Sequence, residues 1–441
     1  MKTVMVKKIS CLVLLIVLSG TWLRAQYAGT APVKTSPAVM AEFMDLRFGM
    51  FIHWGPVSLR GTEIGWSRGQ QVPQQEYDEL YKEFNPVLFD ADAWVKTAKD
   101  AGMKYLTITA RHHDGFCLWP TAYTSYNIMN TPYKKDIVGA LAKACKKQGI
   151  RFCIYYTILD WYHPDYPVHI TGGKIDPKAD MPRYVAFMKN QLKELIEKYD
   201  PYMLWFDGGW ESPWTDEIGR DMYAYLKKLK PDVIVNNRLG KEIAATDNKK
   251  IDVEKMIGDY DTPEQVVGRM NMVTPWESCF TICKQWSWKP NDAMKTLPTC
   301  LDIISKTAGG NGNLLLNVGP MPDGRIEARQ VARLKEIGDW LKQNGEAVYG
   351  TMGGPYAPTD EYAATRKGNR IFLHVLKPGQ TSLALKNIPG RKVLKASVLH
   401  GSAVDVQQQD GNIRLALPAR STGNYIVVLE LDGDTSDIQV I

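Results

Sequence analysis

Short apolar runs alternate with longer amphipathic stretches over residues 41–344. Runs of this length, bounded by Gly, Pro and polar residues, predict strands that are buried on both faces. The amphipathic stretches predict α-helices, and two of them are followed by Gly102 and Gly149, where a C-terminal glycine belongs. The predicted strands are 48–54, 104–110, 151–157, 202–206, 233–236, 273–277 and 313–318, and the predicted helices are 90–100, 136–148, 182–199, 217–230, 292–307 and 326–344.

Strands that alternate with helices indicate a parallel sheet. Seven or eight such units over roughly 300 residues favour a closed (β/α)8-like TIM barrel over an open sheet. After residue 350 the pattern changes to β-branched or alternating runs at 371–376, 392–399, 413–417 and 425–431, punctuated by glycines. This change predicts a C-terminal antiparallel β-sandwich. We therefore expect a catalytic barrel at 26–349 and a sandwich domain at 350–441.

Residues 1–25 have the pattern of a signal peptide. Lys2, Lys7 and Lys8 precede a short apolar run, and Ala25 offers a small residue for cleavage. The apolar run is too short for a membrane span. We expect an exported protein, either periplasmic or secreted.

Composition narrows the class of partner. The formal net charge of +6 falls to +2 without the four basic residues of 1–25, so the chain lacks the basic surface that nucleic acids or acidic membranes require. Six of the seven cysteines follow residue 25, mostly in or beside apolar strands. We expect buried thiols there. Cys279 and Cys283 have no matching His or Cys pair nearby, which argues against a zinc site.

The segment 202–210, YMLWFDGGW, delivers one carboxylate, Asp207, to the end of a buried strand. In parallel β/α folds, catalytic groups lie at the carboxyl ends of the strands. The two glycines that follow allow a sharp turn and the close approach of a ligand. Asp207 could instead cap the next helix, but a cap has no use for the flanking Trp205 and Trp210.

Other predicted strands also end in polar or aromatic groups. These are His53, the pair His112-His113, Tyr155, the triplet Asn236-Asn237-Arg238, and the pair Trp276-Glu277. Such a rim suits a polyhydroxylated ring, because His, Asn and Arg bond hydroxyls while indoles cover C–H faces. The two histidines could also be a hydrogen-bonded core feature, or with Asp114 a metal cluster, although no HExxH or HxH spacing accompanies them.

Cleavage of a glycosidic bond requires two carboxyl groups, and Asp207 is the first candidate. The second is Glu264, on a proline-containing loop, or Glu277, beside Trp276 on a predicted strand. The residues alone leave this choice open.

Five motifs in order along the barrel resemble the α-L-fucosidases of glycoside hydrolase family 29. They are FGMFIHWG at 48–55, TARHHDGFCLW at 109–119, LWFDGGW at 204–210, VNNR at 235–238 and GGNGNLLLNVGP at 309–320. The resemblance implies a barrel followed by a β-sandwich and an exo-acting, retaining hydrolysis of terminal α-L-fucose without metal or other cofactor. It also implies that Asp207 is the nucleophile, and it favours Glu264 over Glu277 as the acid/base.

The same resemblance implies fucose contacts at His53, Trp66, His112, His113, Tyr155, Trp205, Arg238 and Trp288. Some members of the family have Glu-Trp where this chain has Gly65-Trp66, so Glu63 is a candidate for that hydroxyl contact, and Glu277 for another. The expected partner is a fucosylated oligosaccharide or glycoconjugate, and the sequence leaves the oligomeric state open. Two alternatives are a non-catalytic carbohydrate-binding protein on a glycosidase scaffold and a metal-dependent hydrolase that uses the two histidines.

Overall fold

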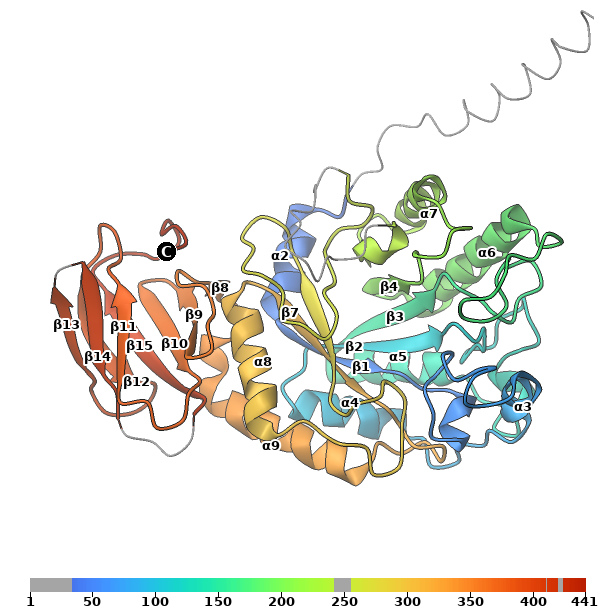
Figure 1. Ribbon diagram of the computed structural model, residues 1–441, viewed down its shortest axis with the longest axis horizontal. Helices are drawn as coiled ribbons and strands as arrows, with labels where there is room; N and C mark the ends of the chain where they lie inside the picture. The colour runs from blue at the N-terminus through green and yellow to red at the C-terminus, as the bar shows by residue number, and fades with distance from the viewer. Residues whose placement is uncertain (1–33, 242–254, 410, 419–422) are drawn as a thin grey trace, which may run out of the picture.

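The computed structural model describes residues 34–241, 255–409, 411–418 and 423–441, so the predicted signal peptide at 1–25 lies outside the described residues. A parallel sheet surrounded by helices forms one part, and antiparallel strands form the other (Figure 1). Among the described residues, no helix combines the length and the apolarity that a membrane crossing demands. The parallel strands are β1 (Phe48–Ile52), β2 (Tyr105–Arg111), β3 (Arg151–Thr157), β4 (Met203–Asp207), β5 (Ile234–Val235), β6 (Glu277–Thr281) and β7 (Asn313–Val318).

The parallel strands follow the order β5-β4-β3-β2-β1-β7-β6. The segment 259–265 lies between the two edge strands and closes the ring. The amide of Asp259 donates to the Val235 carbonyl at 2.6 Å, and the amide of Cys279 donates to the Pro263 carbonyl at 3.0 Å. Because proline lacks an amide hydrogen, this eighth strand is irregular. Single parallel bridges tie it to its neighbours at Asn236–Tyr260, Asp261–Trp276 and Glu264–Cys279. The predicted (β/α)8-like barrel is confirmed.

Side chains alternate along each strand between the barrel interior and the surrounding helices. The interior cluster is largely aromatic and includes Phe51, Tyr105, Tyr155 and Trp205. Phe43 of helix α2 (Pro37–Leu46) joins this cluster, with ring centroids 5.9 Å from Tyr105. The interior is therefore packed rather than hollow.

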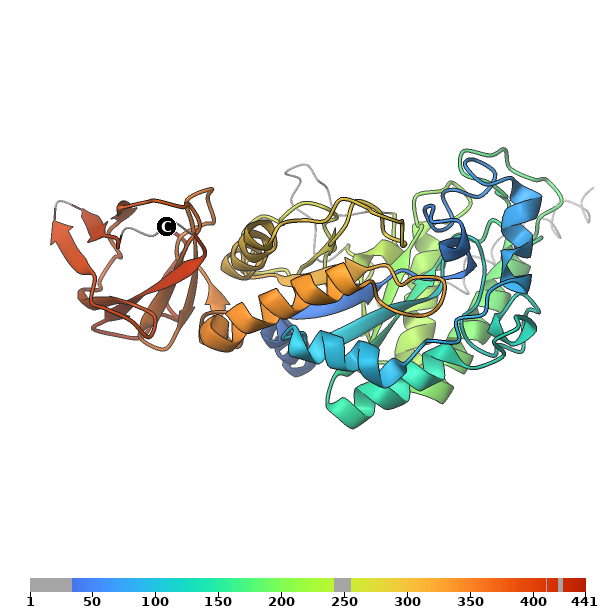
Figure 2. The ribbon, with the colours of Figure 1, turned by 90° about the horizontal axis from the view of Figure 1, so that it is seen from below.

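Helices cover the outside of the barrel (Figures 1 and 2). Their starts follow from the sequence, because the side chains of Asp90, Asp136 and Asp180 accept backbone hydrogen bonds at three N-termini. Gly149 ends one of them in the left-handed region, at φ 74°. The helices are α3 (Gln74–Glu79), α4 (Ala91–Asp100), α5 (Ile137–Gln148), α6 (Met181–Tyr199), α7 (Asp216–Leu229), α8 (Leu297–Gly309) and α9 (Ala328–Asn344), with 3-10 turns η1 (Pro56–Leu59), η2 (Leu80–Lys82), η3 (Ile128–Asn130), η4 (Asn237–Leu239) and η5 (Gly345–Ala347).

One predicted strand was misplaced. The sequence pattern put it at 273–277, whereas β6 covers Glu277–Thr281. Val273 is exposed, and the indole of Trp276 packs within 2.4 Å of where a side chain on Gly312 would begin. The bulky residues therefore come before the strand, and Glu277 opens β6 instead of closing a strand.

The C-terminal antiparallel β-sandwich is also confirmed. One sheet has the order β12-β15-β10-β9-β8 and the other the order β11-β14-β13, and their facing side chains form a separate hydrophobic core. This part packs beside α8 and α9 (Figures 1 and 2), where the indole of Trp340 donates to the Asn424 carbonyl at 2.7 Å. The strands are β8 (Met352–Gly353), β9 (Tyr362–Lys367), β10 (Arg370–Val375), β11 (Ser382–Lys386), β12 (Val393–Val398), β13 (Asp405–Gln409), β14 (Asn412–Ala416) and β15 (Tyr425–Leu431).

The cysteines agree with the expectation of buried thiols. Within the described part of the chain all are buried and free, namely Cys117, Cys145, Cys153, Cys279, Cys283 and Cys300.

Candidate active site

A cavity opens at the carboxyl ends of the barrel strands. Almost every strand contributes a side chain to its wall, as a (β/α)8 architecture allows. The lining residues are Phe51, His53, Trp66, His112, Tyr155, Trp205, Asp207, Trp210, Arg238, Glu264, Cys279 and Trp286.

Asp207 is the last residue of β4, and its carboxylate lies in this cavity. The Tyr155 hydroxyl donates to one carboxylate oxygen at 3.2 Å, and Nη1 of Arg238 donates to the other at 2.9 Å. Helix α7 is capped by Thr215, so Asp207 does not cap it. The backbone turns away at once through Gly208, whose φ of 100° favours glycine. The strand thus presents a fixed carboxylate to a ligand.

Glu264 lies across from Asp207 on the irregular eighth strand. Its Oε2 is also 2.9 Å from Nη1 of Arg238. Two oxygens that share one nitrogen at this distance are no more than about 5.8 Å apart, which is compatible with the roughly 5–5.5 Å spacing of retaining glycosidases. The Glu264 side chain is 41% exposed, against 13% for Asp207. Glu264 therefore faces the mouth of the cavity and Asp207 its interior.

Arg238 contacts both Asp207 and Glu264 and is itself held in place by its neighbours. Its buried guanidinium donates to the Thr262 hydroxyl at 3.0 Å and to the Thr262 carbonyl at 3.1 Å, and it lies 4.7 Å above the ring of Trp205. Burial opposes its charge, but the negative charges of Asp207 and Glu264 raise the pKa of Arg238 overall. The cation therefore stays charged and fixes the relative position of the two carboxylates.

Three buried histidines are neutral rings at the site: His53 and His112 line the cavity, whereas His113 does not line it and packs against His112, with ring centroids 4.2 Å apart. Burial lowers the pKa of His53 and of His113 to about 3 in each case, and it lowers the pKa of His112 as well. The Asn317 amide oxygen lies 2.7 Å from Nδ1 of His53, and the Thr157 hydroxyl lies 2.6 Å from Nδ1 of His113. These contacts fix both rings.

Two buried ring nitrogens of the histidine pair have no hydrogen-bond partner: Nδ1 of His112 and Nε2 of His113, the latter 3.7 Å from Oδ2 of Asp207. An unsatisfied buried polar atom is costly unless a ligand completes it. Ring nitrogens of this kind suit the hydroxyls of a sugar.

Aromatic rings form the floor and the mouth of the cavity. Trp205 stacks on Tyr155 with ring centroids 5.6 Å apart and planes at 19°. At the mouth, Trp66 and Trp210 are 38% and 37% exposed and nearly parallel, with planes at 15°. Flat rings of this kind cover the C–H faces of a pyranose.

Trp288, a predicted fucose contact, does not line the cavity. Trp286 lines it instead, with its ring centroid 4.7 Å from that of His53. The loop that carries both indoles is irregular, so no period in the sequence indicates which one faces inward.

Glu63 does not line the cavity either. Its carboxylate accepts hydrogen bonds from the backbone amides of Trp286 and Ser287, both at 3.0 Å, and from the Ser287 hydroxyl at 3.0 Å. Burial raises the pKa of Glu63. The expected hydroxyl contact is replaced by a structural role, in which Glu63 anchors the loop of Trp286.

Glu277 lies beneath the cavity floor and is fully buried. Its carboxylate accepts from the Tyr105 hydroxyl at 2.5 Å and from the Trp205 indole at 3.0 Å. Burial raises the pKa of Glu277 to about 7. Glu277 does not line the cavity, whose wall includes the Trp205 ring that it bonds.

Asp114 does not join the histidine pair in a ligand set. Its carboxylate accepts from the Tyr77 hydroxyl at 2.7 Å and from the Phe116 amide at 3.2 Å. Over the described ranges, no three His, Cys, Asp or Glu side chains are grouped as a metal ion would need.

Phe51, Cys279 and Trp286 line the cavity although no signal in the sequence indicated them, and Trp210 was indicated only as a neighbour of Asp207. A polar or charged side chain at a strand end is a signal that can be read from sequence, whereas an apolar side chain there is not distinguishable from the core.

Comparison with known proteins finds relatives of this chain and of its architecture. The family model described as alpha-L-fucosidase matches residues 17–346. The tissue alpha-L-fucosidase of Bos taurus is 31% identical over 350 residues, covering 74% of this chain and 72% of the relative. The tissue alpha-L-fucosidase of Homo sapiens is 29% identical over 391 residues, covering 81% of this chain and 80% of the relative.

Solved structures that are similar to this chain are also named alpha-L-fucosidases. The GH29 alpha-L-fucosidase of Bacteroides thetaiotaomicron, trapped as a covalent intermediate with 2-fluoro-fucosyl fluoride, superposes with a TM-score of 0.82 at 31% identity, covering 92% of this chain and 99% of that chain. Alpha-L-fucosidase isoenzyme 1 from Paenibacillus thiaminolyticus gives a TM-score of 0.78 at 32% identity, covering 89% and 99%.

Proposed function

This chain belongs to the α-L-fucosidases of glycoside hydrolase family 29, and we propose that it removes terminal α-L-fucose from glycans or glycoconjugates with Asp207 and Glu264 as its catalytic pair. It is a retaining glycoside hydrolase that acts by double displacement. The observation that carries the residue assignment is the shared contact of both carboxylates with Nη1 of Arg238, at 2.9 Å each.

In the first step, Asp207 attacks the anomeric carbon of fucose and forms a covalent glycosyl ester. Protonated Glu264 donates its proton to the glycosidic oxygen, and the aglycone leaves. The greater exposure of Glu264, 41% of its side chain, suits the role of acid, because the leaving group departs towards the mouth of the cavity. In the second step, Glu264 deprotonates a water molecule, which attacks the same carbon and releases fucose with its configuration retained.

Arg238 and the neutral histidines supply the fixed polar surroundings of these steps. Arg238 binds the Asp207 carboxylate and orients it before attack. His112 and His113 offer their unpartnered ring nitrogens to sugar hydroxyls. Phe51 and Trp286 provide an apolar surface for the C6 methyl group of fucose, which lacks the C6 hydroxyl of galactose.

The closed floor supports an exo mode of action. Trp205 and the packed barrel interior lie beneath the cavity, so a saccharide enters from the mouth with a chain end first. On the sequence pattern of residues 1–25, we further propose that the enzyme is exported to the periplasm or secreted.

Azide rescue tests the assignment against the alternative of a non-catalytic carbohydrate-binding protein. The assay is hydrolysis of an aryl α-L-fucoside by wild type, Asp207→Gly and Glu264→Ala, with and without azide, and Glu277→Gln tests the other candidate acid. We expect both site variants to lose at least about a thousand-fold in kcat. Azide should yield β-fucosyl azide with Asp207→Gly and α-fucosyl azide with Glu264→Ala.

Different failures have different meanings. Full activity of Glu264→Ala would exclude Glu264 as the acid/base. If Glu277→Gln lost turnover while Glu264→Ala kept it, the role would belong to Glu277. A wild-type protein that binds fucose without turnover would favour the non-catalytic alternative.

A further inference from the structure

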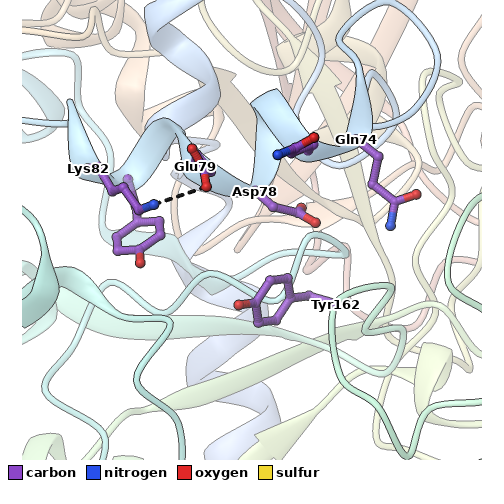
Figure 3. Close-up of a pocket in the computed structure, with 7 residues that line it drawn as sticks. Gln74, Asp78, Glu79, Lys82 and Tyr162 are labelled. Atoms are coloured by element: carbon purple, nitrogen blue, oxygen red, sulfur yellow. Dashed lines mark hydrogen bonds and ion pairs between the residues drawn. The ribbon is translucent and has the colours of Figure 1, made fainter.

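A hollow in the surface beside helix α3 carries a second set of side chains whose chemistry suits a sugar (Figure 3). None of them lines the cavity of Asp207 and Glu264. We call it the α3 hollow, and its residues are Gln74, Gln75, Asp78, Glu79, Tyr81, Lys82 and Tyr162.

Tyr162 gives the α3 hollow a flat aromatic wall. One face of its ring stacks on buried Tyr126, with centroids 4.0 Å apart and planes at 16°. The side chain is nevertheless 41% exposed, so its other face remains open. The Tyr162 amide donates to Asp160 at 3.2 Å, and Asp160 is paired with buried Arg111 at 3.0 Å. The ring is therefore in place before any ligand arrives.

The opposite wall is polar. Figure 3 shows Asp78 and Gln74 projecting from the segment of α3 that faces Tyr162, with Lys82 bonded to Glu79 further along. Asp78 is held by both Nε and Nη2 of Arg68, at 2.5 and 2.7 Å. Amides and fixed carboxylates opposite an exposed ring face can bond hydroxyls while the ring covers C–H groups.

The charges of this wall are balanced. Asp78 is neutralised by Arg68, and Lys82 lies 3.0 Å from Glu79. The other lining residues, Gln74, Gln75, Tyr81 and Tyr162, are uncharged. A site without net charge favours a neutral polyol over a sulfated or sialylated glycan.

The α3 hollow lies on the same side of the barrel as the catalytic cavity. Trp161, the residue before Tyr162, packs against Trp66 and His113, with ring centroids 5.3 Å away in both cases. Tyr77 of α3 donates to Asp114, which follows the histidine pair. One layer of side chains thus separates the two sites.

We propose that the α3 hollow is a second saccharide-binding site, which takes neutral pyranose units of a glycan independently of the fucose in the catalytic cavity. This second site goes beyond the proposed function, because binding of a glycan in the α3 hollow requires no cleavage. An open site of this kind would bind weakly and would raise the local concentration of glycan chains near the cavity.

The test uses wild-type protein and lacto-N-tetraose, a neutral tetrasaccharide without fucose, with binding followed by saturation-transfer NMR. We expect a dissociation constant on the order of 1 mM, unchanged by saturating L-fucose. Tyr162→Ala should weaken binding about ten-fold, and Tyr162→Phe, which keeps the ring, should not. The matched control is Tyr123→Ala, which removes another exposed tyrosine that does not line the hollow.

Because Tyr162→Ala also uncovers Tyr126, Gln75→Ala serves as a second variant that leaves the aromatic packing intact. It should weaken binding about three-fold or more. No binding to wild type, displacement by fucose, or binding that neither variant changes would overturn the proposal.

Hydrolysis of an aryl α-L-fucoside separates the two proposals. Tyr162→Ala should keep kcat/KM within about two-fold of wild type, because the substrate fills only the cavity. A protein that binds the tetrasaccharide but never hydrolyses the fucoside would contradict the proposed function and leave the second site standing.

Discussion

The burial of Glu277 lowers the free energy of unfolding near neutral pH, and the variant Glu277→Gln measures by how much. The carboxyl group is fully buried and accepts hydrogen bonds from Tyr105, Tyr260 and Trp205. Burial raises its pKa from 4.5 to about 7. Glutamine has nearly the same shape but does not ionise.

The raised pKa of Glu277 determines how stability changes with pH. Below pH 4.5 the group is protonated in both folded and unfolded chains, so it adds no penalty. Between pH 4.5 and 7 the unfolded chain releases the proton while the folded chain retains it, so stability falls as pH rises. Above pH 7 the loss is complete and amounts to roughly 3 kcal/mol.

The assay is the thermal midpoint Tm of wild type and Glu277→Gln at pH 4.5 and at pH 8. With about 2.1 cal/mol/K of unfolding entropy per residue, the loss corresponds to about 4 °C. The variant should therefore gain about 4 °C relative to wild type between the two pH values. A difference in Tm that is the same at both pH values would refute the reasoning, since it would mean that Glu277 does not titrate in this window.

Three further predictions concern the surroundings of the site. Glu63→Gln leaves one carbonyl oxygen to hold the loop of Trp286, so we expect KM for an aryl fucoside to rise about five-fold, and an unchanged KM would contradict the anchoring role. Gly209→Ala places a methyl group 2.4 Å from the Gly240 carbonyl oxygen and should lower kcat about a hundred-fold by displacing Asp207. The control Gly55→Ala, whose methyl meets only Ile64 at 3.5 Å, should stay active. EDTA should leave activity intact, because the described residues hold no group suited to a metal; inactivation that zinc reverses would revive the metal-dependent alternative.

The sequence was most informative where a polar residue interrupts an apolar pattern. Asp207, Arg238 and the histidine pair stand at strand ends, and a (β/α)8 barrel necessarily brings strand ends together. The pattern therefore predicted their common location without any knowledge of distances.

It was least informative where the backbone is irregular. Pro263 interrupts the eighth strand. The sequence around Glu264 therefore lacks the alternating pattern from which the orientation of its side chain could be predicted. Trp276 is bulky and apolar but packs on glycines outside β6, which shifted the predicted strand and put Glu277 at the wrong end. In each case a tertiary contact, not a local preference, determines the position.

The three acids nevertheless form one arrangement through the height of the barrel. Glu277 fixes the Trp205 indole from below, Trp205 supports the Arg238 guanidinium, and Arg238 binds Asp207 and Glu264 above. A buried polar network that is fully bonded specifies one geometry at the expense of stability. Retaining hydrolysis depends on a carboxylate spacing of about 5–5.5 Å. The destabilising burial of Glu277 is therefore explained by its contribution to the fixed positions of Asp207 and Glu264.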